Sequence, residues 1–247
     1  MENKPDSVSR FGNRAQSYAA FRPGYPPGAI DAVLAGLGDP SELTIADVGA
    51  GTGISSRLFA GRGARVIAIE PNLRMRSQAD PDPNIEWREG TAQQTGLPDA
   101  SVDLIVACQA FHWFSTIEVM SEFARVARRR AAMLQYERDE RDAFTKAYGE
   151  VVRVYATDDT EAMRQRALAA FVRFPAARIS RAEALSLQEM DREALLGRAA
   201  SSSYLPASGA PAEALRRDLN DLFDRYASEG RVALHMVTYA LTADLQK

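Results

Sequence analysis

The stretch Asp47-Val48-Gly49-Ala50-Gly51-Thr52-Gly53 decides the fold that we expect for this chain. The apolar run 43–48 leads into it and predicts a strand, and residues 53–60 predict a helix directly after it. Glycines tolerate positive φ angles and let a ligand approach the backbone closely. The free N–H groups at the start of the following helix point to the same place. A strand, a glycine-rich turn and a helix in this order indicate a ligand site at the carboxyl edge of a sheet.

Strands and helices alternate along the first half of the chain. Further strands are expected at 65–69, 85–88, 102–107 and 131–136. Helices are expected at 13–20, 27–37, 73–78 and 116–127. The strand at 102–107 is apolar throughout, which is typical of a strand buried on both faces. This alternation predicts an α/β fold of the Rossmann-like, doubly wound type with a mostly parallel sheet.

The pattern changes after Tyr136. Residues 137–174 are charged and alanine-rich, which predicts helices. The later segments predict strands at 179–188 and 232–241, a helix at 191–199 capped by Asp191, and a helix with the apolar face Leu215, Leu219, Leu222, Phe223 and Tyr226. We therefore expect helical additions in the second half and a seven-stranded sheet. The predicted units are 1–136, a Rossmann-like core with N-terminal helices, and 137–247, a helical cap with the strands that complete the sheet.

Composition narrows the functional classes. The chain has 247 residues, a net charge of −3 and a pI of about 5.6, which disfavours a nucleic-acid partner. The basic run Arg128-Arg129-Arg130 is interpreted as a solvated helix end. Cys108, the only cysteine, and the two histidines provide no metal site and no disulfide. A polar start and the lack of a long apolar run predict a cytoplasmic protein without a membrane segment, as a monomer or homodimer.

The glycine pattern also limits the kind of ligand. Glu70 ends the next predicted strand, where an acidic side chain binds ribose hydroxyls. A dinucleotide site needs G-x-G-x-x-G for its pyrophosphate, but Ile54 or Ser56 stands where the third glycine belongs. S-adenosylmethionine contains adenosine without a pyrophosphate. Its sulfonium and methionyl groups suit an acid near the loop, such as Asp47, although this carboxylate can instead cap the amides of the loop itself.

Several segments match the motifs of one enzyme family. They are residues 47–53 and 67–72, the stretches 90–92 and 97–103, the segment 108–114 after the predicted fourth strand, and Phe11, Tyr18 and 22–26 near the N-terminus. In these segments the chain resembles class I S-adenosylmethionine-dependent methyltransferases of the type 11 branch. The N-terminal part is similar to trans-aconitate-methyltransferase-like proteins. The resemblance covers about the first 135 residues well and the second half less specifically.

The resemblance implies S-adenosylmethionine as the cofactor and a role for each matching residue. Gly49 and Gly51 approach its methionyl part, Glu70 binds the ribose, and Gln109 lies near the methyl group. Asn72 and Met75 border the adenosine, and Thr91 and Ala92 its adenine edge. The full set of expected contacts is Asp47, Gly49, Ala50, Gly51, Gly53, Glu70, Pro71, Asn72, Met75, Thr91, Ala92 and Gln109.

The chain departs from the family pattern at two places. Thr91 stands where an aspartate is common. Arg128-Arg129-Arg130-Ala131 stands where Arg-Pro-Gly-Gly usually precedes the fifth strand, which predicts a distorted turn or a longer helix.

The methyl acceptor is expected to be a small molecule, with a carboxylic acid as one candidate. His112 can act as a general base or orient this acceptor, or it can pack with Trp113 as an aromatic wall. Trp113 is expected at the mouth of the acceptor site. Tyr18 and Arg22 can bind an acidic substrate, or they can belong to a packed N-terminal helix. The alternatives to a methyltransferase are a non-catalytic cofactor-binding module and an NAD-type oxidoreductase.

Overall fold

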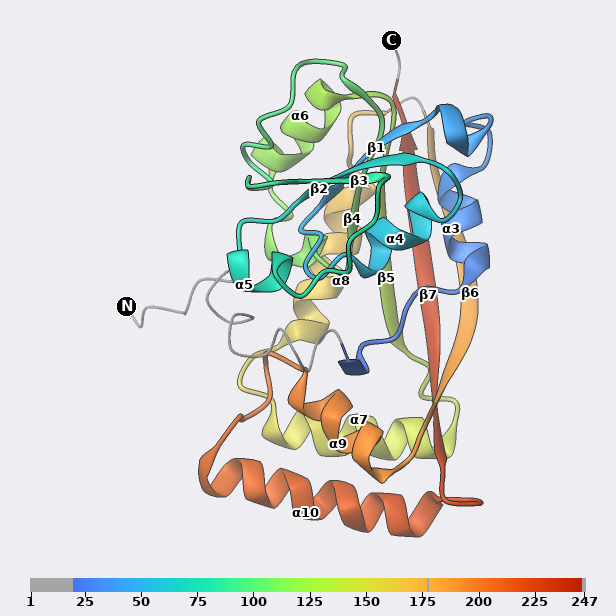
Figure 1. Ribbon diagram of the computed structural model, residues 1–247. Helices are drawn as coiled ribbons and strands as arrows, with labels where there is room; N and C mark the ends of the chain where they lie inside the picture. The colour runs from blue at the N-terminus through green and yellow to red at the C-terminus, as the bar shows by residue number, and fades with distance from the viewer. Residues whose placement is uncertain (1–19, 177, 246–247) are drawn as a thin grey trace.

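The computed structural model describes residues 20–176 and 178–245 of the chain (Figure 1). The strands are β1 (Thr44–Val48), β2 (Arg65–Ile69), β3 (Ile85–Arg88), β4 (Val102–Cys108), β5 (Ala127–Arg138), β6 (Arg178–Met190) and β7 (Val232–Asp244). The helices are α3 (Pro27–Leu34), α4 (Ile54–Ala60), α5 (Leu73–Arg76), α6 (Ile117–Val126), α7 (Ala143–Tyr155), α8 (Thr160–Phe171), α9 (Arg192–Ala200) and α10 (Gly209–Tyr226). The expected helix at 13–20 lies outside the described residues except for its last position.

The seven strands form one sheet in the order β3-β2-β1-β4-β5-β7-β6. Strands β1 to β5 pair in parallel, whereas β7 is antiparallel to both β5 and β6. The expected Rossmann-like fold with a mostly parallel sheet is confirmed. Because β1 pairs with β2 on one side and β4 on the other, the strand order reverses between β1 and β4. Ligands of open α/β sheets bind at the carboxyl ends of the strands at such a switch point.

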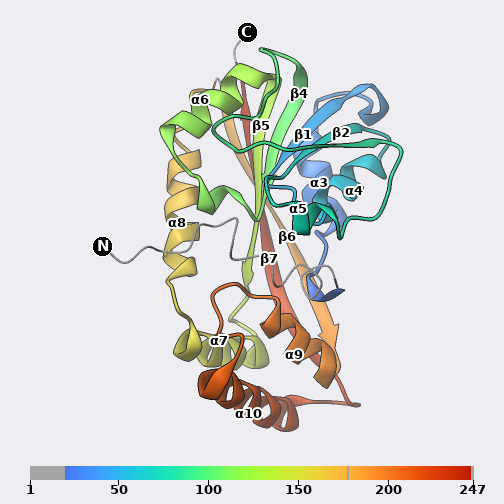
Figure 2. The ribbon, with the colours of Figure 1, turned by 60° about the vertical axis from the view of Figure 1, so that its left-hand side comes forward.

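Helices cover both faces of the sheet (Figure 2). On one face α6 and α8 bury Val119, Phe123 and Phe171 against the strands. On the other face α3 and α4 bury residues such as Ile30 and Phe59. Strand β4 lies between these layers and every one of its residues is buried, as expected from its continuous apolar run. The sheet therefore holds the glycine-rich turn on a rigid support.

A helical cap extends from one end of the sheet. Strand β5 runs beyond Leu134, its last partner position with β4, and continues to Arg138 paired with β7 alone. Helices α7, α9 and α10 form a third core against this extension, with Tyr136, Leu234 and Met236 contributed by the strands (Figure 1). The cap thus stands beyond the carboxyl ends of the parallel strands. A division of the chain at residue 136 stays a prediction, and β5 itself continues from the core into the cap.

The run Arg128–Arg130 does not form a solvated helix end, so this interpretation is wrong. Helix α6 ends at Val126 and is not extended, and the arginines belong to β5, where the pairing with β4 shifts register between Val102 and Leu104. Arg130 is buried and donates hydrogen bonds to the carbonyl oxygens of Val33 and Ala35. These carbonyls lie at the end of α3, where helices lack internal donors. Arg130 therefore satisfies carbonyl groups at the C-terminal end of α3.

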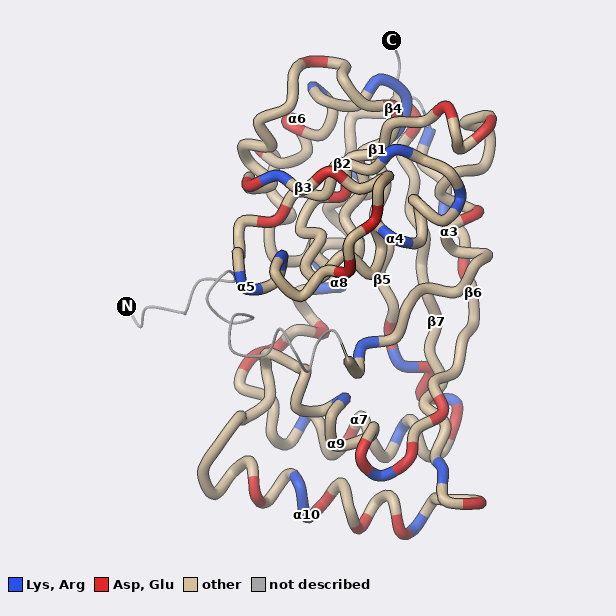
Figure 3. The backbone as a smooth tube through the Cα atoms, viewed as in Figure 1, with Lys and Arg blue, Asp and Glu red and all other residues tan. Residues whose placement is uncertain are grey.

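The cap surface carries mixed charge. Acidic and basic residues both occur along the outer helix α10 (Figure 3). Such interspersed charge is typical of a solvated helix face. Among the helices within the described part of the chain, none is both long and apolar enough to cross a bilayer.

Candidate functional site

The glycine-rich turn lies between β1 and α4, as its pattern predicted. Gly49 and Gly53 have φ angles of 72° and 79°, in the left-handed region that favours glycine. A Cβ atom at Gly49 would lie 2.7 Å from the Cβ of Ala110, in the segment after β4. The N–H groups of Gly49 and Ala50 donate to the carbonyl oxygen of Ile69, at the end of β2. The turn is therefore held tightly against both neighbouring strand ends.

Glu70 follows β2 and faces this turn. Its carboxylate accepts hydrogen bonds of 2.9 Å from the backbone N–H groups of Gly51 and Asn72. Burial raises the pKa of Glu70, although these two hydrogen bonds and nearby Arg76 oppose that effect. A carboxylate has about four acceptor positions, so two hydroxyl groups of a ligand can still bind to it. The geometry agrees with the expected ribose-binding role, which stays a prediction.

Asp47 lies beneath the turn and is fully buried. Its Oδ2 atom accepts hydrogen bonds from the hydroxyl groups of Ser55 at 2.6 Å and Ser56 at 2.7 Å. Burial raises the pKa of Asp47, and the two serine hydrogen bonds oppose this rise. The side chain thus connects β1 to the first turn of α4. A direct contact of Asp47 with the cofactor stays a prediction.

The residues expected around the adenosine lie on the segments after β2 and β3. Asn72 caps α5, because its Oδ1 atom accepts hydrogen bonds from the N–H groups of Arg74 and Met75. Met75 is buried, and its Cε atom would lie 3.3 Å from a Cβ at Gly51. Beyond β3, Thr91 is exposed and Ala92 is buried. Pro71, Asn72 and Met75 therefore lie beside Glu70 and the turn, as a cofactor pocket requires.

Gln109 adopts an unusual backbone conformation directly after β4. Its φ angle is 53°, although it is not a glycine, and such conformations cluster at functional sites. Its N–H group donates to Leu134 O at 2.7 Å and its side-chain amide to Tyr136 O at 3.0 Å. Two hydrogen bonds to β5 thus hold the residue that we expect near the methyl group.

His112 and Trp113 lie on a short 3-10 helix, Phe111–Trp113, and their ring centroids are 4.9 Å apart. His112 is buried, and burial together with the positive charges of Arg164 and Arg22 holds its pKa well below 6.5. The imidazole is therefore neutral at pH 7. Arg22 lies nearby and donates to the Tyr136 hydroxyl at 3.1 Å. Tyr18, the other expected substrate contact, lies outside the described residues.

The structure adds Arg164, which the sequence did not single out. A narrow pocket brings Arg22, Gln109, His112 and Trp113 together with residues of the second half, Thr160, Arg164, Ser203 and Tyr204. Within α8 the buried positions are Thr160, Arg164, Ala167 and Phe171, at helical spacing. An arginine on the buried face of a helix was the available signal, because arginine is almost never fully buried unless paired. Among the described residues no cluster of His, Cys, Asp or Glu forms a metal site.

The turn, the switch point and Glu70 together define a Rossmann-like protein, and this edge of its sheet fits the expected adenosine-type ligand. A family model described as a methyltransferase domain matches residues 46–134. This segment carries the turn, Glu70 and Gln109. An uncharacterized methyltransferase of Mycobacterium tuberculosis is 33% identical over 61% of this chain and 61% of its own length. The chain thus covers less than two thirds of that relative.

Three other proteins are similar to this chain in sequence or in fold. A malonyl-[acyl-carrier protein] O-methyltransferase of Pseudescherichia vulneris is 29% identical over 52% of this chain and 51% of its own length. A provisionally assigned type II methyltransferase of Anaeromyxobacter dehalogenans has the same fold, with a TM-score of 0.64, 23% identity, and coverage of 92% of this chain and 98% of its own. A phosphoethanolamine N-methyltransferase of Haemonchus contortus, solved with S-adenosylhomocysteine, has a TM-score of 0.52 and 15% identity. The match covers 95% of this chain and 58% of that chain.

Proposed function

We propose that this chain is an S-adenosylmethionine-dependent methyltransferase that acts on a small molecule. The observation that carries the proposal is the buried Glu70 carboxylate, which faces the glycine-rich turn at the switch point of the sheet. A ribose fits this acid, and the missing third glycine disfavours a pyrophosphate. The methyltransferase domain at 46–134 supports the same activity. A carboxylic acid acceptor and a trans-aconitate-methyltransferase-like subtype are the finer expectations, together with a cytoplasmic monomer or homodimer.

When bound, S-adenosylmethionine supplies an activated methyl group, so the protein must mainly orient the acceptor and exclude water. Gln109, fixed to β5 by two hydrogen bonds, would hold the edge of the site beside the methyl group of the bound cofactor. His112 and Trp113 line the same narrow pocket as Gln109. A carboxylate acceptor needs no base, because it already carries the attacking lone pair.

Calorimetric titration of the full chain tests the proposed cofactor. We expect S-adenosylmethionine and S-adenosylhomocysteine to bind, and NADH, added as the dinucleotide control, not to bind. Binding of NADH alone would indicate the oxidoreductase alternative. Failure of both sulfur-containing ligands to bind folded protein would refute the proposal. Product formation across a panel of acids, phenols and amines then separates an enzyme from a non-catalytic binding module.

His112 is proposed to orient the acceptor. The imidazole is neutral and has a pKa well below 6.5, so it is a weak base at pH 7. We expect His112→Ala to lower kcat/KM roughly tenfold, since small errors in acceptor position are costly, and to leave the pH profile between 7 and 9 unchanged. Methyl-transfer rates measured across that range provide the readout. His235→Ala, on β7 in the cap, is the control. An unaltered rate in His112→Ala contradicts the proposed role.

A further inference from the structure

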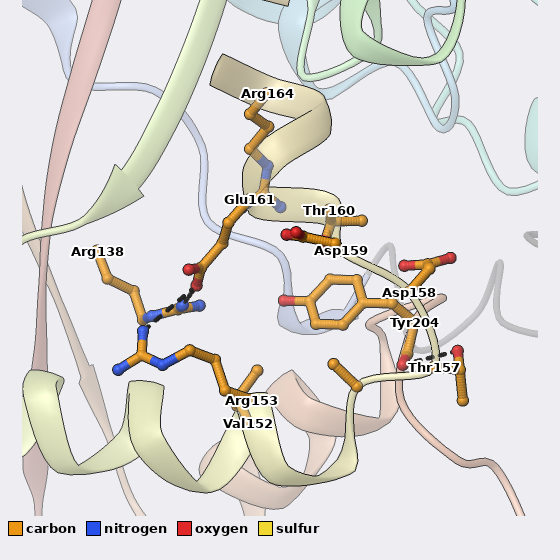
Figure 4. Close-up of a pocket in the computed structure, with 11 residues that line it drawn as sticks. Arg138, Val152, Arg153, Thr157, Asp158, Asp159, Thr160, Glu161, Arg164 and Tyr204 are labelled. Atoms are coloured by element: carbon orange, nitrogen blue, oxygen red, sulfur yellow. Dashed lines mark hydrogen bonds and ion pairs between the residues drawn. The ribbon is translucent and has the colours of Figure 1, made fainter. Parts of the chain in front are cut away.

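A cavity of about 530 Å³ lies between the methyltransferase core and the cap. Its walls come from the end of β5, from α7 and from the start of α8, and the Tyr204 ring lies between α7 and α8 (Figure 4). Thr160, Arg164 and Tyr204 also line the narrow pocket that contains Gln109 and His112. Arg164 therefore stands where the cavity and the proposed methyl-transfer site adjoin.

Arg164 differs from the other arginines of this cavity. Arg138 and Arg153 form a network of ion pairs with Glu140 and Glu161. Arg164 is only 9% exposed, and across residues 20–176 and 178–245 it has no ion pair and its Nε atom has no hydrogen-bond partner. A buried guanidinium without an anion is unfavourable, because it has lost water without gaining a partner. The position therefore favours an anionic ligand.

A second buried arginine, Arg198, lies near Tyr136. Arg198 is 7% exposed, and its guanidinium carbon lies 5.6 Å from the centroid of the Tyr136 ring. Its Nη2 atom contacts the Met236 sulfur at 3.7 Å, and within the described part of the chain no carboxylate pairs with it. Arg22 and Arg198 thus concentrate positive charge around the buried Tyr136 ring.

Among the described residues, none of the three carboxylates that line the cavity forms an ion pair with Arg164. Glu161 is paired with Arg138 and Arg153. Asp159 is exposed and accepts the N–H of Ala162 as the cap of α8. The remaining lining carboxylate, Asp158, belongs to the loop before α8.

The titration of nearby groups agrees with this arrangement. Burial alone would raise the pKa of Tyr204, but Arg164, Arg22 and Arg138 outweigh it and lower the value to about 8. In the same way, Arg22 and Arg198 outweigh burial at Tyr136 and lower its pKa to about 7. An environment that stabilises phenolates also stabilises other anions.

We propose that Arg164 binds an anionic group, a carboxylate or a phosphate, of the methyl acceptor. The inference rests on the proposed methyltransferase function and names the class of its acceptor. A guanidinium matches the geometry of either oxyanion through paired N–H groups. Because Arg164 and Gln109 line the same narrow pocket, an acceptor held at Arg164 extends toward the proposed methyl position.

The test is calorimetry on the full chain saturated with S-adenosylhomocysteine. The probes are benzoate, succinate and inorganic phosphate, with neutral benzamide as the uncharged control. We expect at least one anion to bind the wild type, and which one binds separates a carboxylate from a phosphate. In Arg164→Gln its affinity should fall at least about tenfold, since hydrogen bonds to charged groups are lost. The affinity for S-adenosylhomocysteine should not change.

Two further variants keep the test decisive. Arg166→Gln removes the same charge from the exposed face of α8 and should leave anion binding unchanged. Arg164→Lys keeps the charge without the guanidinium fork, so it should bind the anion with intermediate affinity and serves if Arg164→Gln does not fold. Equal anion binding by the Arg164 variants and wild type would overturn the inference, as would wild type that binds S-adenosylhomocysteine but no anion. Wild type that fails to bind S-adenosylhomocysteine contradicts the proposed function instead.

Discussion

Glu70→Ala is expected to weaken S-adenosylhomocysteine binding by at least roughly 100-fold, because hydrogen bonds from ligand hydroxyls to a charged acceptor contribute about 1.5–3 kcal/mol each. The variant also removes the acceptor for the N–H groups of Gly51 and Asn72, which hold the turn and the start of α5 in place. Both losses act on the same site. Calorimetry of the purified variant measures the affinity, and circular dichroism reports whether the fold is retained.

The matched control is Glu89→Ala. Glu89 follows β3, and its side chain is 77% exposed and pairs with Arg76. Glu89→Ala removes the same charge near the site, but Glu89 is not a hydrogen-bond acceptor for the turn. The affinity for S-adenosylhomocysteine should therefore stay unchanged. Glu70→Gln provides a second comparison, because its amide N–H₂ would face one of the two backbone N–H groups and the affinity should fall as well. If Glu70→Ala binds as tightly as wild type, the ribose assignment is wrong.

The parallel half of the fold could be predicted from the sequence because its signals are local. A buried strand such as β4 shows a continuous apolar run, and the turn after β1 requires glycine wherever φ is positive. Likewise, Asp191 precedes α9 and accepts the N–H of Ala194, as its sequence position indicated. These features depend on neighbours in the chain, so their residue types are sufficient to identify them.

The cap side of the site depends instead on contacts between distant residues. The proposed role of Arg164 depends on its position beside Gln109 and His112, which belong to the core. It also depends on the lack of a partner carboxylate among the described residues. No spacing in the sequence expresses this arrangement. The interpretation of Arg130 was wrong for the same reason, since its acceptors Val33 O and Ala35 O lie at the end of α3, far away in the chain. The partners of a buried arginine are set by tertiary contacts. Sequence periodicity predicts only the helix or strand to which the arginine belongs.

Arg130→Ala should therefore be among the most destabilising single changes in the protein. Arg130 is 4% exposed, and its Nε atom donates to Asp244 Oδ1 at 2.6 Å while Nη1 binds both α3 carbonyls. Breaking a buried ion pair by removing one partner costs about 3–5 kcal/mol. In a chain of this size we expect Tm to fall by roughly 10 °C, measured by calorimetry or circular dichroism.

Arg178→Ala is the control for this change, because Arg178 pairs with the same carboxylate at 2.8 Å but is 70% exposed. An exposed pair contributes less than about 1 kcal/mol, so Tm should hardly move. Partial burial raises the pKa of Asp244, but Arg130 and Arg178 outweigh it and hold the value below 3.8. The contribution of the Arg130 pair is therefore complete at neutral pH and is lost as the pH falls below 3.8, through the folded-state pKa. Equal loss of stability in the two variants at pH 7 would show that burial of Arg130 and its contacts to α3 contribute nothing beyond a surface ion pair.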